Sequence, residues 1–196
     1  MRGSSIAIIT AASASLASYG VEALQWSVVV APGQAEILNG TVQRVYEQLR
    51  QINPGFAPGE AQAQSRKQRL LQEQTPVNCG TYPLANKGRI QEDIAYLRQV
   101  AAAPRNGPGP GNCGQVSCSQ GAAIWWCNDN LVPKTLDNWG LVANSAQYIL
   151  EVCAPAADQV TGQNFESGNW NTIVRGLIAE EEHWPCLWHQ DCAGAY

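Results

Sequence analysis

The densest set of chemically active side chains lies at the C-terminal end of the 196-residue chain. Four residues of the types that bind zinc follow one another at intervals of three: His183, Cys186, His189 and Cys192. Pro185 prevents one continuous helix through all four positions, and four ligands on so short a segment crowd poorly around a tetrahedral ion. We therefore expect no metal site. We favour a tail disulfide instead, either between Cys186 and Cys192 or from one of them to Cys118.

The cysteines are confined to the second part of the chain, and they are Cys79, Cys113, Cys118, Cys127, Cys153, Cys186 and Cys192. So many cysteines in a short chain indicate an oxidising compartment and a disulfide framework. A bridge that closes a long loop stabilises a fold by about 2–4 kcal/mol. The odd number leaves one thiol free or available to another chain.

A hairpin turn predicted at Gln120-Gly121 constrains the pairing of three cysteines. It places Cys127 opposite Gly114, and it offsets Cys118 from Cys127 by roughly 13 Å along the strands, at about 3.3 Å per residue. A disulfide needs Cα atoms within about 7 Å of each other. We therefore expect Cys127 to pair with Cys113, helped by a bulge at Gly114.

Two of the seven tryptophans, Trp125 and Trp126, are adjacent in a predicted strand, so their side chains point to opposite faces of a sheet. Tryptophan is enriched in binding hot spots, and the candidate binding residues are Trp125, Trp126, Trp170 and Asp129. A second interpretation, in which most tryptophans are core residues, stays open. Asn128-Asp129-Asn130 lacks the bidentate glutamate of a calcium loop and is typical of a turn.

The sequence contains no G-x-S-x-G, no H-E-x-x-H and no phosphate-binding glycine loop. The acidic run 180–182 beside His183 suggests acid–base chemistry, but such a run is typically a solvated helix face. We therefore expect no catalytic residue, no cofactor and no enzymatic activity. The alternative is a secreted hydrolase or nuclease that uses His183 or His189 together with these glutamates.

The N-terminal region has the features of an export signal. A short basic start precedes an apolar stretch of about signal-peptide length from Ile6 to Ala17, and small residues follow at candidate cleavage sites. We interpret residues 1–23 as a signal peptide and the protein as secreted. The net charge of −4 without a Lys/Arg cluster argues against a nucleic-acid partner. No apolar run approaches the roughly 18 residues of a membrane span.

Residues 24–75 are interpreted as a helical leader or propeptide, and whether it is retained stays open. Five apolar residues recur at roughly helical spacing in its first part: Ile37, Val42, Val45, Leu49 and Ile52. A second, polar segment from Glu60 to Gln74 is also compatible with a helix. Asn39-Gly40-Thr41 is an N-glycosylation sequon, so Asn39 is a candidate modification site.

Residues 76–178 are predicted to form a cysteine-rich α+β domain, followed by a Trp/Cys-rich tail over 179–196. Turn signals and periodicity predict a strand, a helix, a hairpin, a helix and a strand, over residues 75–79, 89–102, 116–127, 133–153 and 170–175. This β-α-β-β-α-β order predicts a disulfide-braced, two-layer split βαβ sandwich with an antiparallel sheet. Cys79 on the first strand and Cys153 at the end of the second helix make a natural pair.

Two stretches of this domain, 113–119 and 123–130, resemble small secreted cysteine-rich proteins of filamentous fungi, which are candidate effectors; 162–163 and 169–174 add to the likeness. More loosely, Val77-Asn78-Cys79 together with Cys153 resembles the smut-fungus killer toxin family. That resemblance covers about residues 76–176 and implies a split-βαβ sandwich with a Cys79–Cys153 disulfide. The chain has fewer cysteines than the toxin and no matching basic surface residues, so the toxin's mechanism is not implied.

These observations together predict a secreted, non-enzymatic effector or killer-toxin-like protein. It would act on a host or competitor cell by binding a surface protein or glycan through loops and exposed tryptophans on a rigid scaffold. Besides the hydrolase or nuclease, the remaining alternative is a glycan-binding or cell-wall-binding module built on Trp125, Trp126 or Trp170.

Overall fold

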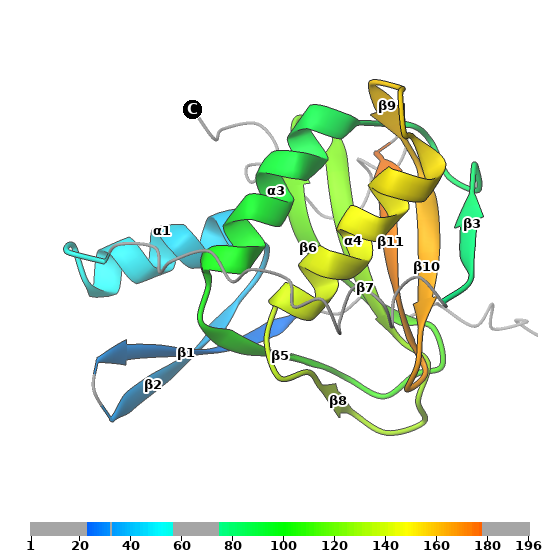
Figure 1. Ribbon diagram of the computed structural model, residues 1–196. Helices are drawn as coiled ribbons and strands as arrows, with labels where there is room; N and C mark the ends of the chain where they lie inside the picture. Colours follow the sequence, from blue (N-terminus) through cyan, green and yellow to red (C-terminus); the bar gives the residue numbers. More distant parts are fainter. Residues whose placement is uncertain (1–22, 32, 57–74, 178–196) are drawn as a thin grey trace, which may run out of the picture.

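The computed structural model describes residues 23–31, 33–56 and 75–177, which form an α+β fold with antiparallel sheets and three helices (Figure 1). The elements are β1 (Gln25–Ala31), β2 (Gln34–Asn39), α1 (Val42–Ile52), β3 (Val77–Cys79), β4 (Ala85–Asn86), α3 (Lys87–Gln99), β5 (Ala102–Asn106), β6 (Asn112–Ser119), β7 (Ala122–Asn128), β8 (Lys134–Thr135), α4 (Gly140–Cys153), β9 (Gln159–Val160), β10 (Gly162–Glu166) and β11 (Trp170–Gly176). Within these ranges, no helix has both the length and the apolar character needed to cross a bilayer.

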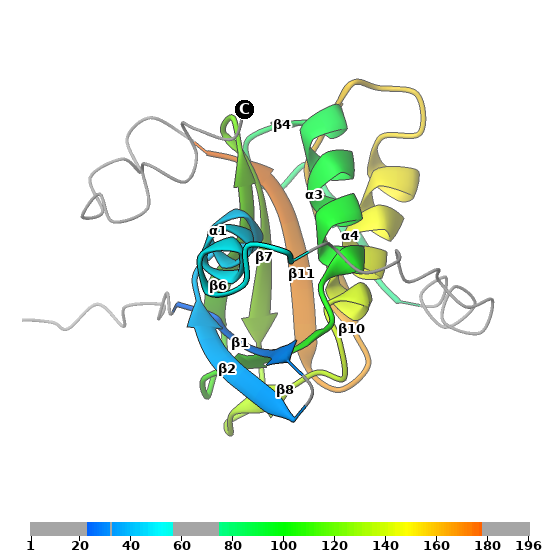
Figure 2. The same ribbon diagram turned by 90° about the vertical axis from the view of Figure 1, so that its left-hand side faces the viewer.

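The larger sheet has five antiparallel strands in the order β3-β10-β11-β7-β6. Helices α3 and α4 lie side by side over one of its faces, α3 against β6 and β7 and α4 against β10 and β11 (Figure 2). Gly162 permits this close packing, because a Cβ there would lie 2.8 Å from Ile149 Cγ2 and 2.9 Å from Cys153 Sγ. The opposite face of the sheet is called the outer face below.

A cluster of three tryptophans occupies the core. The rings of Trp26 and Trp139 stack with centroids 3.8 Å apart, and Trp126 meets Trp139 edge-on at 6.0 Å. All three side chains are fully buried. Because Trp26 comes from β1 and Trp126 from β7, the cluster joins the N-terminal segment to the five-stranded sheet.

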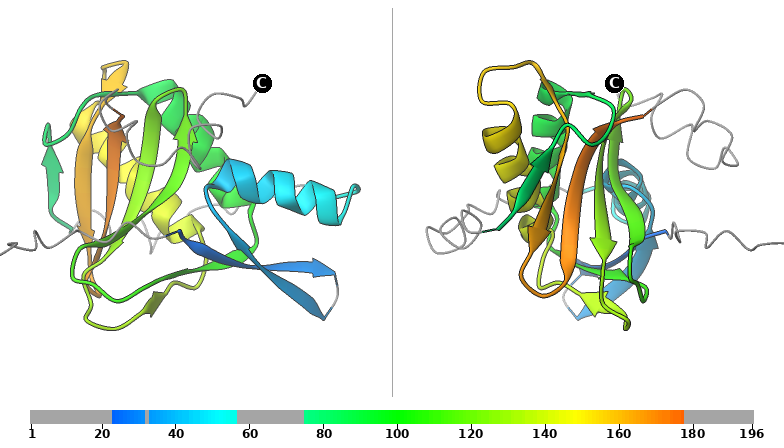
Figure 3. Two further views of the ribbon diagram at one scale, coloured as in Figure 1. Left: turned by 180° about the vertical axis from the view of Figure 1, so that it is seen from behind. Right: turned by 90° about the vertical axis from the view of Figure 1, so that its right-hand side faces the viewer.

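The N-terminal segment differs from the predicted leader, because residues 25–39 form a hairpin of strands. β1 and β2 belong to a second antiparallel sheet, ordered β2-β1-β5-β8, and they project beyond the larger sheet (Figures 1 and 3). Trp26 and Val28 are buried while Val29 is exposed, which is the period of two of a strand. Gly40, with a φ of 115°, separates β2 from α1, so the helix begins at Val42 and excludes Ile37. The predicted helix over 60–74 lies outside the described residues.

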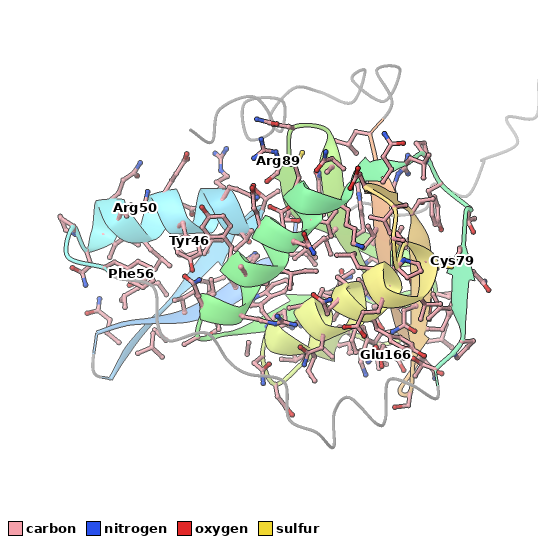
Figure 4. All side chains as sticks on the ribbon, turned by 45° about the horizontal axis from the view of Figure 1, so that its top comes forward. Tyr46, Arg50, Phe56, Cys79, Arg89 and Glu166 are labelled. Carbon is pink, nitrogen blue, oxygen red and sulfur yellow. A yellow bond between two sulfur atoms is a disulfide. The ribbon has the colours of Figure 1, made fainter. Side chains whose placement is uncertain are left out.

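Helix α1 packs into the same core through its apolar face. Val42, Val45 and Leu49 are buried. The ring of Tyr46 meets Phe56 at 5.9 Å and Tyr96 of α3 at 5.6 Å, both edge-on (Figure 4). Residues 24–56 therefore contribute to the interior of the described fold through several side chains.

The predicted elements of the cysteine-rich part recur with shifted boundaries, the five-stranded sheet contains one strand that was not predicted, and the short strands β4, β5, β8 and β9 were not predicted either. The helix predicted over 89–102 is α3, which ends at Gln99 because β5 begins at Ala102. The helix predicted over 133–153 begins only at Gly140, because Lys134 and Thr135 form strand β8, which pairs with β5. The additional strand, β10, lies between β3 and β11, so the five-strand order differs from the four strands that the sequence predicts.

Two predicted disulfides are confirmed. Cys79–Cys153 ties β3 to the end of α4, with Cα atoms 5.4 Å apart (Figure 4), and Cys113–Cys127 links paired positions of β6 and β7, with Cα atoms 4.0 Å apart. The bulge lies between Gln115 and Ser117, at Val116, two residues further along β6 than the predicted position at Gly114. Cys118 is also disulfide-bonded, and its predicted partners Cys186 and Cys192 lie outside the described residues.

Candidate binding surface at the loop end of the sheet

Three loops meet at one end of the five-stranded sheet, where β7 ends (Figure 1). They cover residues 107–111, 129–133 and 167–169, and we call this surface the loop end. Gly109 N donates to Asn130 O at 2.6 Å, which joins the first loop to the second. Asp129 N donates to Asn169 O at 3.0 Å, which joins the second loop to the third.

Two asparagine side chains hold the loop end together. The Nδ2 of the fully buried Asn128 donates to Gly107 O at 2.7 Å and to Val132 O at 2.9 Å, and its Oδ1 accepts from Asn130 N at 3.0 Å. Asn130 Nδ2 lies 2.9 Å from Asn169 O. Because buried amides satisfy the loop carbonyls directly, the conformation of residues 129–133 is set before any partner binds.

The close contact between the first two loops requires glycine at position 109. A Cβ there would lie 2.0 Å from Asn128 O and 3.1 Å from Asn130 O, and both are backbone atoms that cannot move aside. The third loop is a tight turn in which Gly168 and Asn169 have φ values of 98° and 56°. Such left-handed conformations are most accessible to glycine and asparagine.

Asp129, a predicted binding residue, forms part of this framework. Its Oδ1 accepts from Gly111 N at 3.2 Å, and its Oδ2 accepts from Asn171 Nδ2 at 2.7 Å. Both carboxylate oxygens therefore stabilise the loop end. In the described ranges, no group of three His, Cys, Asp or Glu side chains is placed to hold a metal ion.

The tip of the second loop carries two exposed apolar side chains. Leu131 is 79% exposed and Val132 is 64% exposed, the two highest values among the large hydrophobic residues of the described ranges. Lys134 Nζ donates to Gly168 O at 2.9 Å, which attaches the far side of the tip to the third loop. The apolar tip, Leu131 and Val132, is thus held on both sides. Sequence reasoning missed it, and the signal was two apolar residues between an Asn-Asp-Asn turn and Pro133.

The predicted tryptophans lie in different environments. Trp126 and Trp170 are 0% and 6% exposed, and their burial removes them from the surface that a partner reaches. The alternation of β7 explains this, because Trp126 points toward the helices and Trp125 toward the outer face. Trp125 is half-buried opposite Gln115 and Ile173, and its Nε1 has no hydrogen-bond partner among the residues that the structure describes.

A row of polar side chains crosses the outer face and ends at Asp129. Tyr82 Oη donates to Gln163 Oε1 at 3.2 Å, Gln163 Nε2 donates to Asn171 Oδ1 at 2.9 Å, and Asn171 Nδ2 reaches Asp129. The Arg175 guanidinium lies 5.5 Å from the centroid of the Tyr82 ring. Burial raises the pKa of Tyr82, so its hydroxyl stays protonated and donates at neutral pH. These hydrogen bonds, made by side chains of β10 and β11, therefore hold the Asp129 carboxylate in one orientation.

A second polar cluster surrounds Asp93 of α3. Its fully buried carboxylate accepts from Ser119 Oγ at 2.6 Å, from Ser117 Oγ at 2.8 Å and from Gln43 Nε2 at 2.8 Å. Burial raises the pKa of this carboxyl to about 6, against the lowering effect of these hydrogen bonds. Since the group has no access to solvent, the cluster connects α1, α3 and β6 instead of presenting a reactive site.

Several predicted residues lie elsewhere. Asn39 of the sequon is exposed at the end of β2. The candidate tail residues lie outside the described ranges: Glu180, Glu181, Glu182, His183, Cys186, His189 and Cys192. Comparison of the chain with protein-family models, with curated proteins and with solved structures finds no match.

Proposed function

We propose that the protein is a secreted, non-enzymatic effector or toxin-like protein that binds a protein on the surface of a host or competitor cell through its loop end. The observation that carries this proposal is the apolar tip, Leu131 and Val132, on loops whose hydrogen bonds are already made. A preformed loop loses little conformational entropy when it binds, so more of the contact energy appears as affinity.

The size of the expected contribution follows from the exposed side chains. Burying a leucine or valine side chain that was in water is worth about 1.5–3 kcal/mol. Because Leu131 and Val132 are 79% and 64% exposed, about two thirds or more of this gain is available to a partner. Apolar anchors surrounded by polar groups are typical of the centres of protein interfaces.

Two further observations support the secreted part of the proposal. The described disulfides, Cys79–Cys153 and Cys113–Cys127, are compatible with an extracellular location. The sequence-level resemblance to secreted fungal proteins points the same way, and a split-βαβ arrangement of the killer-toxin kind remains part of this proposal. The two helices on one face of the five-stranded sheet support that arrangement (Figure 2).

The surface-protein partner is preferred over the other candidate functions. A glycan-binding module would need exposed aromatic platforms, and Trp126 and Trp170 are buried, which leaves Trp125. The hydrolase or nuclease depends on His183 and His189, which lie outside the described residues. No observation favours either alternative over the loop end.

The test is cell-surface binding of the full chain with Leu131 and Val132 both replaced by serine. Labelled protein is titrated onto plant and fungal cells, and bound protein is measured by flow cytometry. Losing two apolar anchors of about 1.5 kcal/mol each weakens binding about a hundredfold. A matched control is Leu84→Ser, another exposed apolar residue, at 57%. Equal binding by the parent, the double variant and the control would overturn the proposal.

A further inference from the structure

The β1–β2 hairpin exposes a second apolar surface, away from the loop end. Val29 is 62% exposed and Ile37 is 58% exposed. Ile37 pairs with Ser27 and Val29 pairs with Ala35, so the two apolar residues are diagonal neighbours on one face of the hairpin. The opposite face packs inward through Trp26 and Leu38. We call Val29 and Ile37 the hairpin patch. Figure 3 shows the hairpin extending away from the larger sheet.

Asn39 lies on the same face as the hairpin patch. It is two residues beyond Ile37 on β2, which places it on the same side of the strand at a distance of about 7 Å. Asn39 is exposed, and it is followed by Gly40 and Thr41, which complete an acceptor sequon. The one hydrogen bond described for Asn39 outside the sheet uses its backbone O, which accepts from Gln48 Nε2 at 3.0 Å.

We propose that an N-linked glycan on Asn39 covers the hairpin patch, so that the first sugars pack their C–H faces against Ile37 and Val29. The occupant of this apolar surface is thus an oligosaccharide that begins with N-acetylglucosamine and is attached to this chain itself. A glycan attached two residues from Ile37 is held beside the patch at a high effective concentration. The inference rests on the export that belongs to the proposed function, but it does not depend on the loop end.

The attachment is a group transfer with a defined balance. The donor is a lipid-pyrophosphate-linked oligosaccharide, which an oligosaccharide transferase of the cell that secretes the protein uses as its substrate. The Asn39 Nδ2 forms a bond to C1 of the first N-acetylglucosamine, and an amide proton is released. The bond from C1 to the pyrophosphate oxygen breaks, and the lipid pyrophosphate leaves with the electron pair. Thr41 supplies the hydroxyl residue that the sequon requires.

The glycan would protect the exposed hairpin patch from association with other molecules. Exposed apolar side chains on a strand near a sheet edge promote edge-to-edge association. β2 is the outermost strand of its sheet, and it carries Ile37. A bulky, hydrated group at the end of this strand both covers the apolar atoms and obstructs pairing of a further strand.

The experiment compares three forms of the full chain secreted by a eukaryotic host: the parent, Asn39→Gln, and Asn78→Gln as a control at an exposed asparagine outside any sequon. Mass spectrometry of the peptide that contains Asn39 measures occupancy. Hydroxyl-radical labelling then measures side-chain accessibility at Ile37 and Val29. Leu131 and Val132 serve as internal references, because they are exposed on the loop that precedes β8, the strand at the other edge of the four-stranded sheet from β2, and that loop contains no sequon.

We expect the parent and Asn78→Gln to carry the glycan, and Asn39→Gln to lack it. Labelling of Ile37 and Val29 should then rise several-fold in Asn39→Gln, while labelling of Leu131 and Val132 stays constant. An exported parent with an unmodified Asn39, or equal labelling of the hairpin patch with and without glycan, would overturn the inference. Either result leaves cell-surface binding by the loop end intact, so the two proposals fail separately.

Discussion

Acidification is expected to stabilise this fold through Asp93. The buried carboxyl has a pKa of about 6 in the folded protein, against an ordinary value of 3.8. The folded state therefore binds this proton more tightly than the unfolded state does between these two pH values. Stability from this group is greatest below about pH 4 and declines as the pH rises through 6. Each pKa unit is worth about 1.4 kcal/mol, so the decline amounts to about 3 kcal/mol.

Asp93→Asn tests this reasoning, because the amide keeps the shape of the carboxyl and does not titrate. The hydroxyls of Ser117 and Ser119 can rotate to accept from it. The assay is urea unfolding of the disulfide-intact protein at several pH values from 4 to 7, followed by tryptophan fluorescence. The parent should lose about 2 kcal/mol more over this range than Asp93→Asn does, because the unfolded carboxyl is already partly ionised at pH 4 and contributions common to both proteins cancel.

Glu92→Gln is the matched control, at the neighbouring carboxyl whose side chain is 55% exposed. Its charge raises the pKa of Asp93 only as a minor effect, behind burial, so this variant should keep most of the pH dependence of the parent. Parallel stability curves for the parent and Asp93→Asn between pH 4 and 6 would refute the account. So would a parent whose stability increases over that window relative to Asp93→Asn.

Two further substitutions test the packing. Trp26→Ala should cost about 3–5 kcal/mol in urea unfolding, because Trp26 stacks on Trp139 and donates from Nε1 to Gly40 O at 2.8 Å; a cost below about 1 kcal/mol would show that residues 24–56 do not belong to the core. Gly109→Ala should lower stability by about 1–3 kcal/mol, because its Cβ would lie 2.0 Å from Asn128 O, whereas Gly55→Ala in an exposed turn should change stability by less than about 1 kcal/mol. Equal melting temperatures for the two glycine variants would contradict the close contact between the loops.

The cysteine pairs were predictable because local geometry determines them. Gln120 and Gly121 both have positive φ, at 49° and 76°, which is the conformation of a two-residue hairpin turn. Such a turn sets the register of β6 and β7 next to it, and the bulge between Gln115 and Ser117 shifts that register by one residue, which brings Cys113 opposite Cys127. The position of the bulge was predicted wrongly, at Gly114, because the amino-acid composition of a strand says little about where a bulge lies.

Strand β10 was not predictable from its pattern. The residues that face the helices are Gly162, Asn164 and Glu166, so the face of the strand that packs on the helices is not apolar. Asn164 is buried because its Nδ2 donates to Ser145 Oγ of α4 at 2.9 Å, a tertiary contact that the sequence does not reveal. Buried polar residues of this kind hide a strand from any argument based on hydrophobic alternation.

The β1–β2 hairpin was predictable in principle. Trp26 and Val28 alternate with polar or exposed neighbours, and Gly33 and Gly40, both with positive φ, bound the second strand. This strand pattern was overlooked because Ile37 of β2 lies at helical spacing from the apolar residues of α1, so it was assigned to the helix. The apolar tip was missed for another reason, since only the structure tells an exposed leucine from a buried one.

The most direct test of a disulfide-braced, exported scaffold is non-reducing peptide mapping of the protein recovered from culture medium. The account predicts linked peptides for Cys79–Cys153 and Cys113–Cys127, with Cys118 in a further bridge. Recovery of the native protein from the cytosol alone, with free thiols at these five cysteines, would contradict it.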